Sequence, residues 1–203
     1  MNKRIYLASR SPRRRELLKQ IGVSFELVLL REDPRRGADV DERPLRDEPA
    51  RDYALRIART KAEVAAEQTM RRGLLAYPVL AADTTVVHDQ EIIGKPADAE
   101  DAERMLSRLA GREHRVLTAI AIATRDQVEA RLSDSAVEFR ALTPEEIHRY
   151  VATGEALDKA GAYAVQGRAA AFVTRISGSY SGIMGLPLAE AAALLQRFGI
   201  DVV

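Results

Sequence analysis

The sequence predicts an α/β protein in which an extended, twisted sheet is flanked by helices. Short runs rich in Val, Ile, Leu and Thr alternate along the chain with stretches whose apolar residues recur at helical spacing. Two long β-rich runs, residues 114–124 and 128–140, flank Arg125-Asp126-Gln127, which is typical of an antiparallel hairpin. Together these patterns indicate a mixed sheet in a single domain over residues 1–203.

The first third of the chain predicts a strand that leads directly into a helix. Residues 5–8 are apolar, and Ser11 and Pro12 suit the N-cap and first position of a helix that runs to about residue 20. Residues 25–30 predict a second strand. Residues 31–49 mix charges with prolines and lack a period, so we expect a loop, and loops this long are usually functional or disordered.

The middle of the chain predicts two helices and two strands. Residues 50–72 have helical spacing and end at Gly73. Residues 78–88 and 91–93 read as strands around a tight turn, and a helix capped by Asp98 follows over residues 99–109.

The last third begins, after the hairpin, with a capping-box sequence. Thr143 and Glu146 have the capping-box spacing, so a short helix is expected to run to about residue 151. The remaining expected elements are a glycine-containing loop at 157–167, a strand at 171–176, a polar glycine-rich loop at 177–186 and a final helix at 187–198.

The composition argues against several classes of protein. The formal net charge of +1 over 203 residues does not favour bulk binding to nucleic acid or to a membrane surface. The apolar runs are too short to span a bilayer, and the arginine-rich start does not read as a secretion signal. The absence of cysteine excludes disulfides and thiol metal sites and is typical of a cytoplasmic protein.

A basic turn precedes the first expected helix. Ser9, Ser11 and the arginines between positions 10 and 15 lie where free backbone N–H groups and the helix dipole favour an anion. Arginine adds a rigid donor fork that matches phosphate oxygens. The turn is therefore a candidate phosphate site, and a solvated basic turn is the alternative.

Asp83 interrupts the otherwise apolar strand expected over residues 78–88, and we expect the buried part of that strand to end there. Burying a carboxylate costs several kcal/mol unless it is paired, hydrogen-bonded or bound to a metal. We therefore expect Asp83 to have such a partner or a function. A cap on the strand or a pair with an arginine is the structural alternative to a catalytic role.

Lysine is rare in this chain, with 5 lysines against 26 arginines. A lysine kept against this bias marks a place where a compact ammonium is required. Lys61, Lys95 and Lys159 lie in motif-like contexts, whereas Lys3 and Lys19 read as surface residues. With five residues, chance is the alternative.

Several familiar sites do not occur in the sequence. The three histidines lack metal-ligand spacing, no serine has a nucleophile-elbow context, and neither common phosphate-loop motif is present. The arginines and lysines remain, with the carboxylates Glu42, Asp83 and Asp158. These are the residue types of a metal-assisted phosphate reaction.

Six motifs give the chain a resemblance to a known family. They are LASRSPRRRELL at 7–18, RIARTKA at 56–62, AADTTV at 81–86, GKP at 94–96, LDKAGAYAVQG at 157–167 and GSYSGIMGLPL at 178–188. In this order they resemble the Maf family of nucleoside triphosphate pyrophosphatases over nearly the whole chain. The form of the 157–167 motif resembles the branch acting on dTTP and UTP rather than the branch acting on 7-methyl-GTP.

The resemblance implies a set of site residues. Asp83 corresponds to the catalytic acid-base residue. Arg13, Thr84 and Gln166 match positions associated with base specificity, and Ser9, Arg14, Lys61 and Lys95 match the phosphate-binding set. Glu42 is the implied second carboxylate beside Asp83 at a divalent metal, Mg²⁺ or Mn²⁺. Residues 31–38 look like an insertion, which leaves Glu32 and Asp33 as alternatives to Glu42.

The resemblance also implies a fold and an activity. The fold is elongated, related to the inosine triphosphatases, with a cleft between two lobes, and the protein is expected to be a homodimer. The activity is hydrolysis of dTTP and UTP, with modified pyrimidine nucleotides as further candidate substrates, to the nucleoside monophosphate and pyrophosphate. Its expected role is house-cleaning of nucleotides or control of cell division. A nucleotide-sensing regulator of septum formation with little turnover is the main alternative. An RNA-binding protein is disfavoured by the near-zero net charge.

Overall fold

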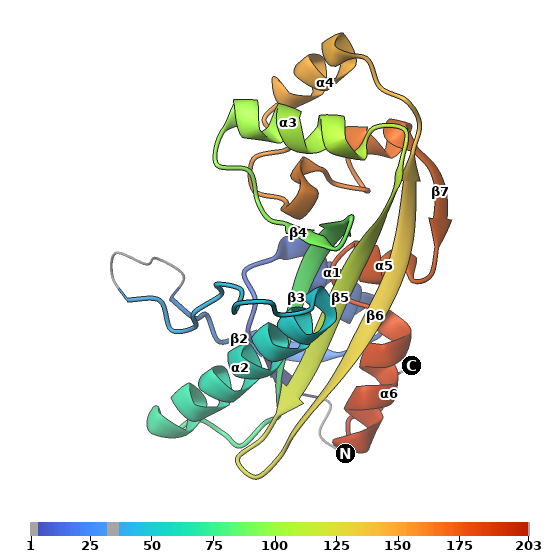
Figure 1. Ribbon diagram of the computed structural model, residues 1–203. Coiled ribbons are helices and arrows are strands. Elements are labelled where there is room, and N and C mark those ends of the chain that lie inside the picture. The colour runs from blue at the N-terminus through green and yellow to red at the C-terminus, as the bar shows by residue number, and fades with distance from the viewer. Residues whose placement is uncertain (1–3, 32–36, 203) are drawn as a thin grey trace.

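A mixed sheet runs through the centre of the protein, in a computed structural model that describes residues 4–31 and 37–202 (Figure 1). Within these residues seven strands are hydrogen-bonded in the order β2-β1-β3-β5-β6-β7, with β4 paired to β3. Their bounds are β1 Arg4–Leu7, β2 Ser24–Leu27, β3 Val79–His88, β4 Glu91–Ile93, β5 Glu113–Ala123, β6 Val128–Phe139 and β7 Val173–Ser177. The pairs of β1 with β2 and β3 are parallel and the others antiparallel, so the predicted mixed α/β class is confirmed.

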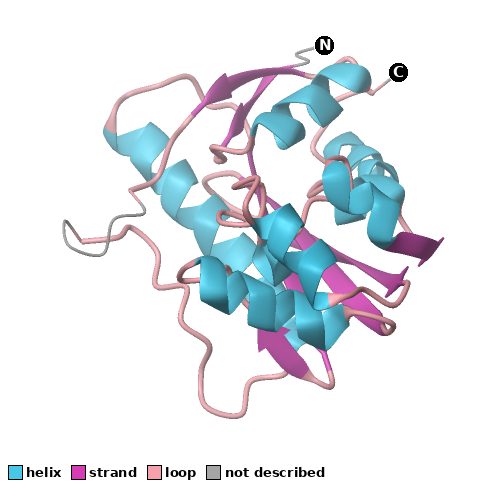
Figure 2. Ribbon diagram, turned by 90° about the horizontal axis from the view of Figure 1, so that it is seen from above, coloured by secondary structure: helices cyan, strands magenta, loops and turns pink. Residues whose placement is uncertain are grey.

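Helices cover both faces of the lower part of the sheet and build a separate upper lobe (Figures 1 and 2). Their bounds are α1 Pro12–Gln20, α2 Ala50–Arg71, α3 Ala99–Leu109, α4 Pro144–Val151, α5 Tyr180–Ile183 and α6 Leu188–Arg197. Helix α2 packs on one face of the sheet, and α1 and α6 pack on the other. Helices α3 and α4 pack with residues 156–173 over the ends of the long strands. Among the described residues, no helix combines the length and apolar character that crossing a membrane requires.

The close packing of α2 follows from its small residues. Ala54, Ala58, Ala62 and Ala65 lie on one side of the helix and are fully buried against the sheet. Their short side chains let the helix backbone approach β3 and β5 closely, because nothing longer than a methyl group separates them. Functional side chains on α2 therefore lie directly against the strands.

Strand β3 has an unpaired segment between its two partners on one edge. Strand β1 pairs with β3 only at Val79 and Leu80, because β1 ends at Leu7 and the chain turns into α1. Strand β4 pairs with β3 only from Val86 to His88. In the described part of the chain, no strand pairs with residues 81–85 on this edge, and this free segment contains Asp83 and Thr84.

Local sequence signals explain the start of three helices. The side chain of Ser11 accepts a hydrogen bond from the N–H of Arg14, and the side chain of Asp98 accepts one from Asp101. Thr143 and Glu146 form the complete capping box at α4. The predictions of these caps are confirmed, since each depends only on residues within one helical turn.

Four predicted elements differ from the structure, and one is the loop predicted at 157–167, which contains the 3₁₀ helix η2 (Ala160–Ala162). Strand β2 ends at Leu27 rather than at residue 30, because its partner β1 turns away. The carbonyl of Leu30 accepts a hydrogen bond from the Arg10 guanidinium and not from a neighbouring strand. The apolar run before β7 forms the 3₁₀ helix η3 (Arg168–Phe172), and β7 starts only at Val173, since an apolar run does not distinguish a helical turn from a strand. The loop predicted at 177–186 contains helix α5.

Candidate active site

Asp83 lies in the middle of β3, on the face of the sheet that α2 covers. The strand predicted over residues 78–88 is confirmed, but its buried part does not end at Asp83, since β3 continues, mostly buried, for five residues beyond it to His88. Its Oδ1 accepts a hydrogen bond of 2.8 Å from Lys61 Nζ, and its Oδ2 accepts one of 3.1 Å from Thr85 Oγ1. The buried carboxylate thus has its charge partner on α2, and this partner is a lysine rather than an arginine.

Glu42 joins this cluster through the same lysine. Its Oε1 lies 3.0 Å from Lys61 Nζ, and 45% of its side chain remains exposed, against 12% for Asp83. The structure therefore brings together Glu42 and Asp83, the two carboxylates implied at a metal, and Lys61 of the implied phosphate-binding set. Glu32 and Asp33, the alternatives to Glu42, lie outside the described residues.

The segment that carries Glu42 is held on α2 by polar contacts. Tyr53 donates a 2.9 Å hydrogen bond to the carbonyl of Glu42, and Arg56 donates to the carbonyl of Arg43 and to the carboxylate of Glu48. The Arg56 guanidinium lowers the pKa of Glu48 to about 2. Burial and the nearby carboxylates of Asp83 and Glu42 raise the pKa of Tyr53 to about 12. Residues 42–48 are therefore an ordered arm that presents a carboxylate to the free segment of β3.

Arg14 organises a second cluster on the opposite face of β3. Thr84 points away from Asp83, because neighbouring residues of a strand face opposite sides. The Arg14 guanidinium donates to Thr84 Oγ1 and Ser9 Oγ at 3.2 Å each, and to the carbonyl of Gly185 at 2.8 Å. Buried Thr118 on β5 lies 3.1 Å from Thr84 Oγ1 and donates to the carbonyl of Gly182. The structure thus brings Ser9, Arg14 and Thr84 together.

Gly185 lets the chain pass close to this cluster. Its φ of +113° lies in the region that side chains avoid, and a Cβ there would stand 3.5 Å from Arg14 and 3.6 Å from Thr84. The glycine-rich loop before α6 thereby delivers a backbone carbonyl to Arg14.

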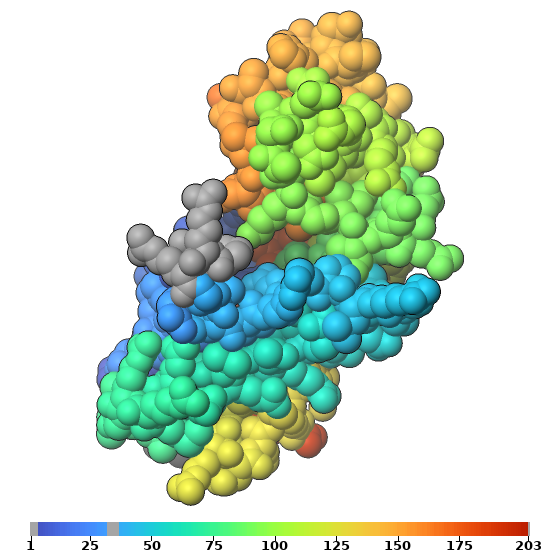
Figure 3. All heavy atoms as spheres, turned by 60° about the vertical axis from the view of Figure 1, so that its left-hand side comes forward, coloured from blue at the N-terminus to red at the C-terminus, as the bar shows by residue number. Residues whose placement is uncertain are grey.

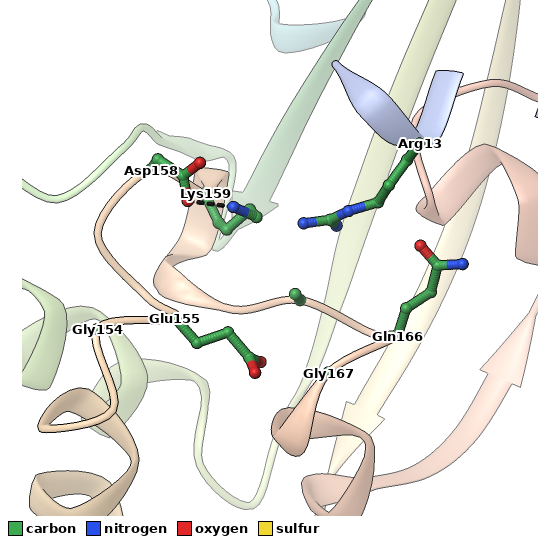
Figure 4. Close-up of a pocket in the computed structure, with 8 residues that line it drawn as sticks. Arg13, Gly154, Glu155, Asp158, Lys159, Gln166 and Gly167 are labelled. Atoms are coloured by element: carbon green, nitrogen blue, oxygen red, sulfur yellow. Dashed lines mark hydrogen bonds and ion pairs between the residues drawn. The ribbon is translucent and has the colours of Figure 1, made fainter. Parts of the chain in front are cut away.

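Arg13 and Gln166 line one cavity of about 380 Å³. Figure 4 shows the Arg13 guanidinium and the Gln166 amide reaching into the same space from different elements. Asp158 and Lys159 form an ion pair on the opposite wall, and Lys159 lowers the pKa of Asp158 through that bond. Thr84 does not line this cavity, so only two of the three implied specificity residues face it together.

Lys95 occupies an exposed position in the loop after β4. The carbonyl of the preceding Gly94 accepts a 3.0 Å hydrogen bond from Gly161, which places this loop beside residues 159–161. Gly161 itself packs on β3, since a Cβ there would come within 3.0 Å of Val86. In Figure 3 a hollow lies between the segment near residue 45 and the upper lobe. The predicted two lobes with a central cleft are thus present.

Glu42 and Asp83 fit a divalent cation by their donor chemistry. No group of three or more His, Asp or Glu side chains in the described ranges is placed to hold a metal ion. Mg²⁺ in phosphate-transfer sites typically uses one or two carboxylates, with substrate oxygens and water completing its coordination. The two carboxylates that meet at Lys61 match that requirement.

Sequence reasoning missed Tyr53, Thr118 and Glu155. Tyr53 and Thr118 read as core positions of a helix and a strand, and both place a neighbouring site residue through a hydrogen bond. Glu155 lines the cavity with Arg13 and Gln166. No local signal marks these three, because their partners lie on other elements or across a turn.

Comparison with known proteins places the chain in a family. Residues 4–198 match the model of a family that is described as "Maf-like protein". A dTTP/UTP pyrophosphatase of Nitrosomonas europaea is 54% identical over 198 residues, covering 98% of this chain and 96% of its own. One of Aromatoleum aromaticum is 56% identical over 197 residues, covering 97% and 96%. The Staphylococcus aureus Ham1 protein superposes with a TM-score of 0.45 at 18% identity, covering 67% of this chain and 71% of its own. The profile match and the near full-length identity show that this chain belongs to the Maf family.

Proposed function

We propose that this protein hydrolyses dTTP and UTP to the nucleoside monophosphate and pyrophosphate. Two relatives that match nearly the whole chain carry the name dTTP/UTP pyrophosphatase, which supports this activity. The observation that carries it is the free segment of β3, where Lys61 holds Asp83 and Glu42 on one face and Arg14 holds Thr84 and Ser9 on the other. Attack of water on a phosphoanhydride requires carboxylates that accept a proton or hold a metal, and cations that offset the phosphate charge. Both kinds of group surround this open strand edge.

The cations of the site bind the polyphosphate. A nucleoside triphosphate carries several negative charges that repel an attacking water, so these charges must first be offset. Arg14 presents a guanidinium already oriented by three hydrogen bonds, which reduces the entropy lost on binding phosphate. The exposed Lys95 supplies further positive charge and Ser9 adds a hydroxyl, whereas the ammonium of Lys61 is paired with Asp83 and Glu42.

Asp83 accepts the proton of the attacking water. The water oxygen forms a bond to the α-phosphorus, the bond from that phosphorus to the bridging oxygen breaks, and pyrophosphate leaves with the electron pair. Lys61 and Thr85 fix both carboxylate oxygens of Asp83, so the base stays oriented. Positioned proton transfer of this kind typically contributes about 10²–10⁴-fold in rate.

Glu42 and Asp83 would hold the divalent metal, Mg²⁺ or Mn²⁺. When bound, the metal would offset charge on the phosphate oxygens and lower the pKa of water. The half-exposed Glu42 carboxylate faces Lys61 and remains accessible, whereas Asp83 is almost fully covered.

Base recognition is proposed at the cavity shared by Arg13 and Gln166. Uracil and thymine present carbonyl oxygens and one N3–H, and a side-chain amide can donate to the former and accept from the latter. Cytosine presents a ring acceptor and an amino donor instead, so one hydrogen bond would be lost. Thr84 lies outside this cavity and contacts Arg14 of the phosphate-binding set, so the proposed recognition of the base rests on Arg13 and Gln166.

The test is a turnover screen of the purified chain over nucleoside triphosphates with Mg²⁺ and with Mn²⁺. UTP should yield UMP and pyrophosphate, and initial products of UDP and orthophosphate would contradict the proposed bond. Tight binding of UTP without pyrophosphate release would favour a nucleotide-sensing regulator. We also propose that residues 1–203 act as one functional domain in a cytoplasmic homodimer, and light scattering tests the dimer.

A further inference from the structure

Glu155 is bonded to the segment that carries Gln166. It follows α4 and lines the cavity that Gln166 faces. Its Oε2 accepts a 3.1 Å hydrogen bond from the backbone N–H of Arg168, two residues beyond Gln166. Its Oε1 accepts a 3.0 Å hydrogen bond from the hydroxyl of Tyr150. One carboxylate therefore connects α4 to the turn after Gln166.

Gly167 is the position that lets this carboxylate approach. A Cβ at Gly167 would stand 2.1 Å from Glu155 Oε1 and 2.3 Å from its carboxyl carbon, so the carboxylate fills the place of a side chain. The turn is also closed by bonds from the N–H of Gly167 to Ala164 and from that of Ala170 to Gly167. Figure 4 shows the Glu155 side chain directed towards this part of the loop.

Tyr150 makes the other end of this connection rigid. Its side chain is buried and packs edge-to-face on Phe172, with ring centroids 5.2 Å apart. Burial raises the pKa of Tyr150, with a further contribution from the bond to Glu155, so the hydroxyl stays protonated as a donor. The carboxylate is thus held from the packed core of the upper lobe.

Within the described residues, the Gln166 side chain forms no hydrogen bond or ion pair that would orient it, and it is exposed to the cavity. Its direction is therefore set by its backbone, and that backbone is held by the bonds at residues 164, 167 and 168. Loss of the carboxylate would leave the N–H of Arg168 and the hydroxyl of Tyr150 without this acceptor.

We propose that Glu155 is a positioning residue for base discrimination, which holds the Gln166–Arg168 turn so that the Gln166 amide faces the base. The inference rests on the proposed function, because it assigns a role in choosing the base. Glu155 acts through Gln166 and not by contact with the base. Its effect should therefore appear in the preference between bases and should depend on the presence of the Gln166 amide.

The experiment measures kcat/KM for UTP and CTP in a double-mutant cycle of Glu155→Gln and Gln166→Ala. Glutamine keeps the volume of Glu155 but turns one of its two acceptors into a donor. The UTP-over-CTP ratio should fall at least about 5-fold in Glu155→Gln and change by less than about 2-fold when Gln166→Ala is already present. Tyr150→Phe, which removes one donor to the carboxylate, should lower the ratio by a smaller factor.

Glu100→Gln is the matched control. Glu100 lies on α3 and pairs with Arg104 at the surface, 3.0 Å away, so its replacement should leave the ratio unchanged. Equal losses of kcat/KM for UTP and CTP in Glu155→Gln, or losses in the ratio that add to those of Gln166→Ala, would overturn the positioning role. Such additivity would indicate that Glu155 contacts the base itself.

Hydrogen exchange separates this inference from the proposed function. Glu155→Gln should speed amide exchange in residues 164–170 while the hairpin of β5 and β6 keeps its protection, whatever the substrate. Unchanged exchange in 164–170 would overturn the inference. Absence of pyrophosphate release from the unmodified protein would instead overturn the proposed function, and the exchange result would still decide whether Glu155 holds the turn.

Discussion

Lys61 donates a 2.8 Å hydrogen bond to Asp83, and so links α2 to the middle of β3 at the centre of the site. The same ammonium lies 3.0 Å from Glu42, so two carboxylates share one lysine. Two negative charges against one positive charge leave an excess that a bound cation would offset. This explains why a lysine is retained at position 61 in a chain that otherwise uses arginine, since a compact ammonium fits between two carboxylates.

Replacement of Asp83 by asparagine should lower kcat/KM for UTP by at least about 10²-fold, because the amide cannot accept the proton of water. The volume is unchanged and Lys61 keeps an acceptor, so the fold should persist. Pyrophosphate release and circular dichroism measure the two effects. Asp126→Asn, in the exposed β5–β6 turn, is the control and should retain activity. Near-normal turnover in a folded Asp83→Asn variant would remove Asp83 from the chemistry.

Removal of the divalent metal with EDTA should abolish turnover, and Mg²⁺ or Mn²⁺ should restore it. Glu42→Gln should then raise the metal concentration needed for half-maximal activity by about 10-fold or more, because one of two anionic ligands is lost. Titration of activity against Mg²⁺ measures this change. An unchanged titration would point to Glu32 or Asp33 instead of Glu42, and variants at these two positions would locate the ligand.

Gln166 should set the preference for uracil and thymine over cytosine. The loss of one hydrogen bond and the unpaired polar group cost about 1–3 kcal/mol, which corresponds to a preference of roughly 5- to 150-fold in kcat/KM. Gln166→Glu should weaken this preference, because a carboxylate cannot donate to a carbonyl oxygen. Kinetics with UTP, dTTP, CTP and dCTP measure it. Equal kcat/KM for UTP and GTP in the unmodified protein would contradict the pyrimidine assignment.

His114 should make stability fall as the pH is lowered. Burial, with a smaller contribution from His88, lowers the pKa of His114 from 6.5 to about 4 in the folded protein. Between these values the unfolded chain binds the proton more tightly than the folded chain does. The free energy of unfolding should therefore fall by about 2 kcal/mol between about pH 6.5 and about pH 5, where paired carboxylates remain ionised.

Urea unfolding at several pH values measures the effect of His114. Its Nε2 lies 2.8 Å from the Tyr163 hydroxyl, so His114→Gln keeps a polar partner there while removing the titrating group. This variant should lose most of the dependence between about pH 5 and about pH 6.5. Exposed His148, paired with Glu103, is the matched control, and His148→Gln should keep the dependence. An unchanged slope in His114→Gln would contradict the assignment.

Local chemistry in the sequence determined most of the elements of this protein. Ser11, Asp98 and the Thr143 capping box mark helix starts within a single turn of chain, and the alanine stripe of α2 marks its buried side. The motifs also indicated the family, and the resemblance pointed to Asp83 and Glu42 as metal-side carboxylates and to Lys61 as a phosphate-binding residue. Such signals are readable because each depends on residues close together in the chain or on a pattern shared with relatives.

Only the tertiary structure decided how these residues meet. The free segment of β3 exists because β1 ends after two paired positions and β4 begins later, which no local pattern in β3 reports. Asp83 and Thr84 are consecutive in sequence, yet their side chains lie on opposite faces of the sheet. Their hydrogen-bond partners are Lys61 on α2 and Arg14 on α1. The Glu155 carboxylate is positioned by its contacts with Tyr150 and Gly167, and neither contact produces a periodic pattern or a motif in the sequence. These relationships depend on which elements pack together, and the sequence encodes that packing only through the whole fold.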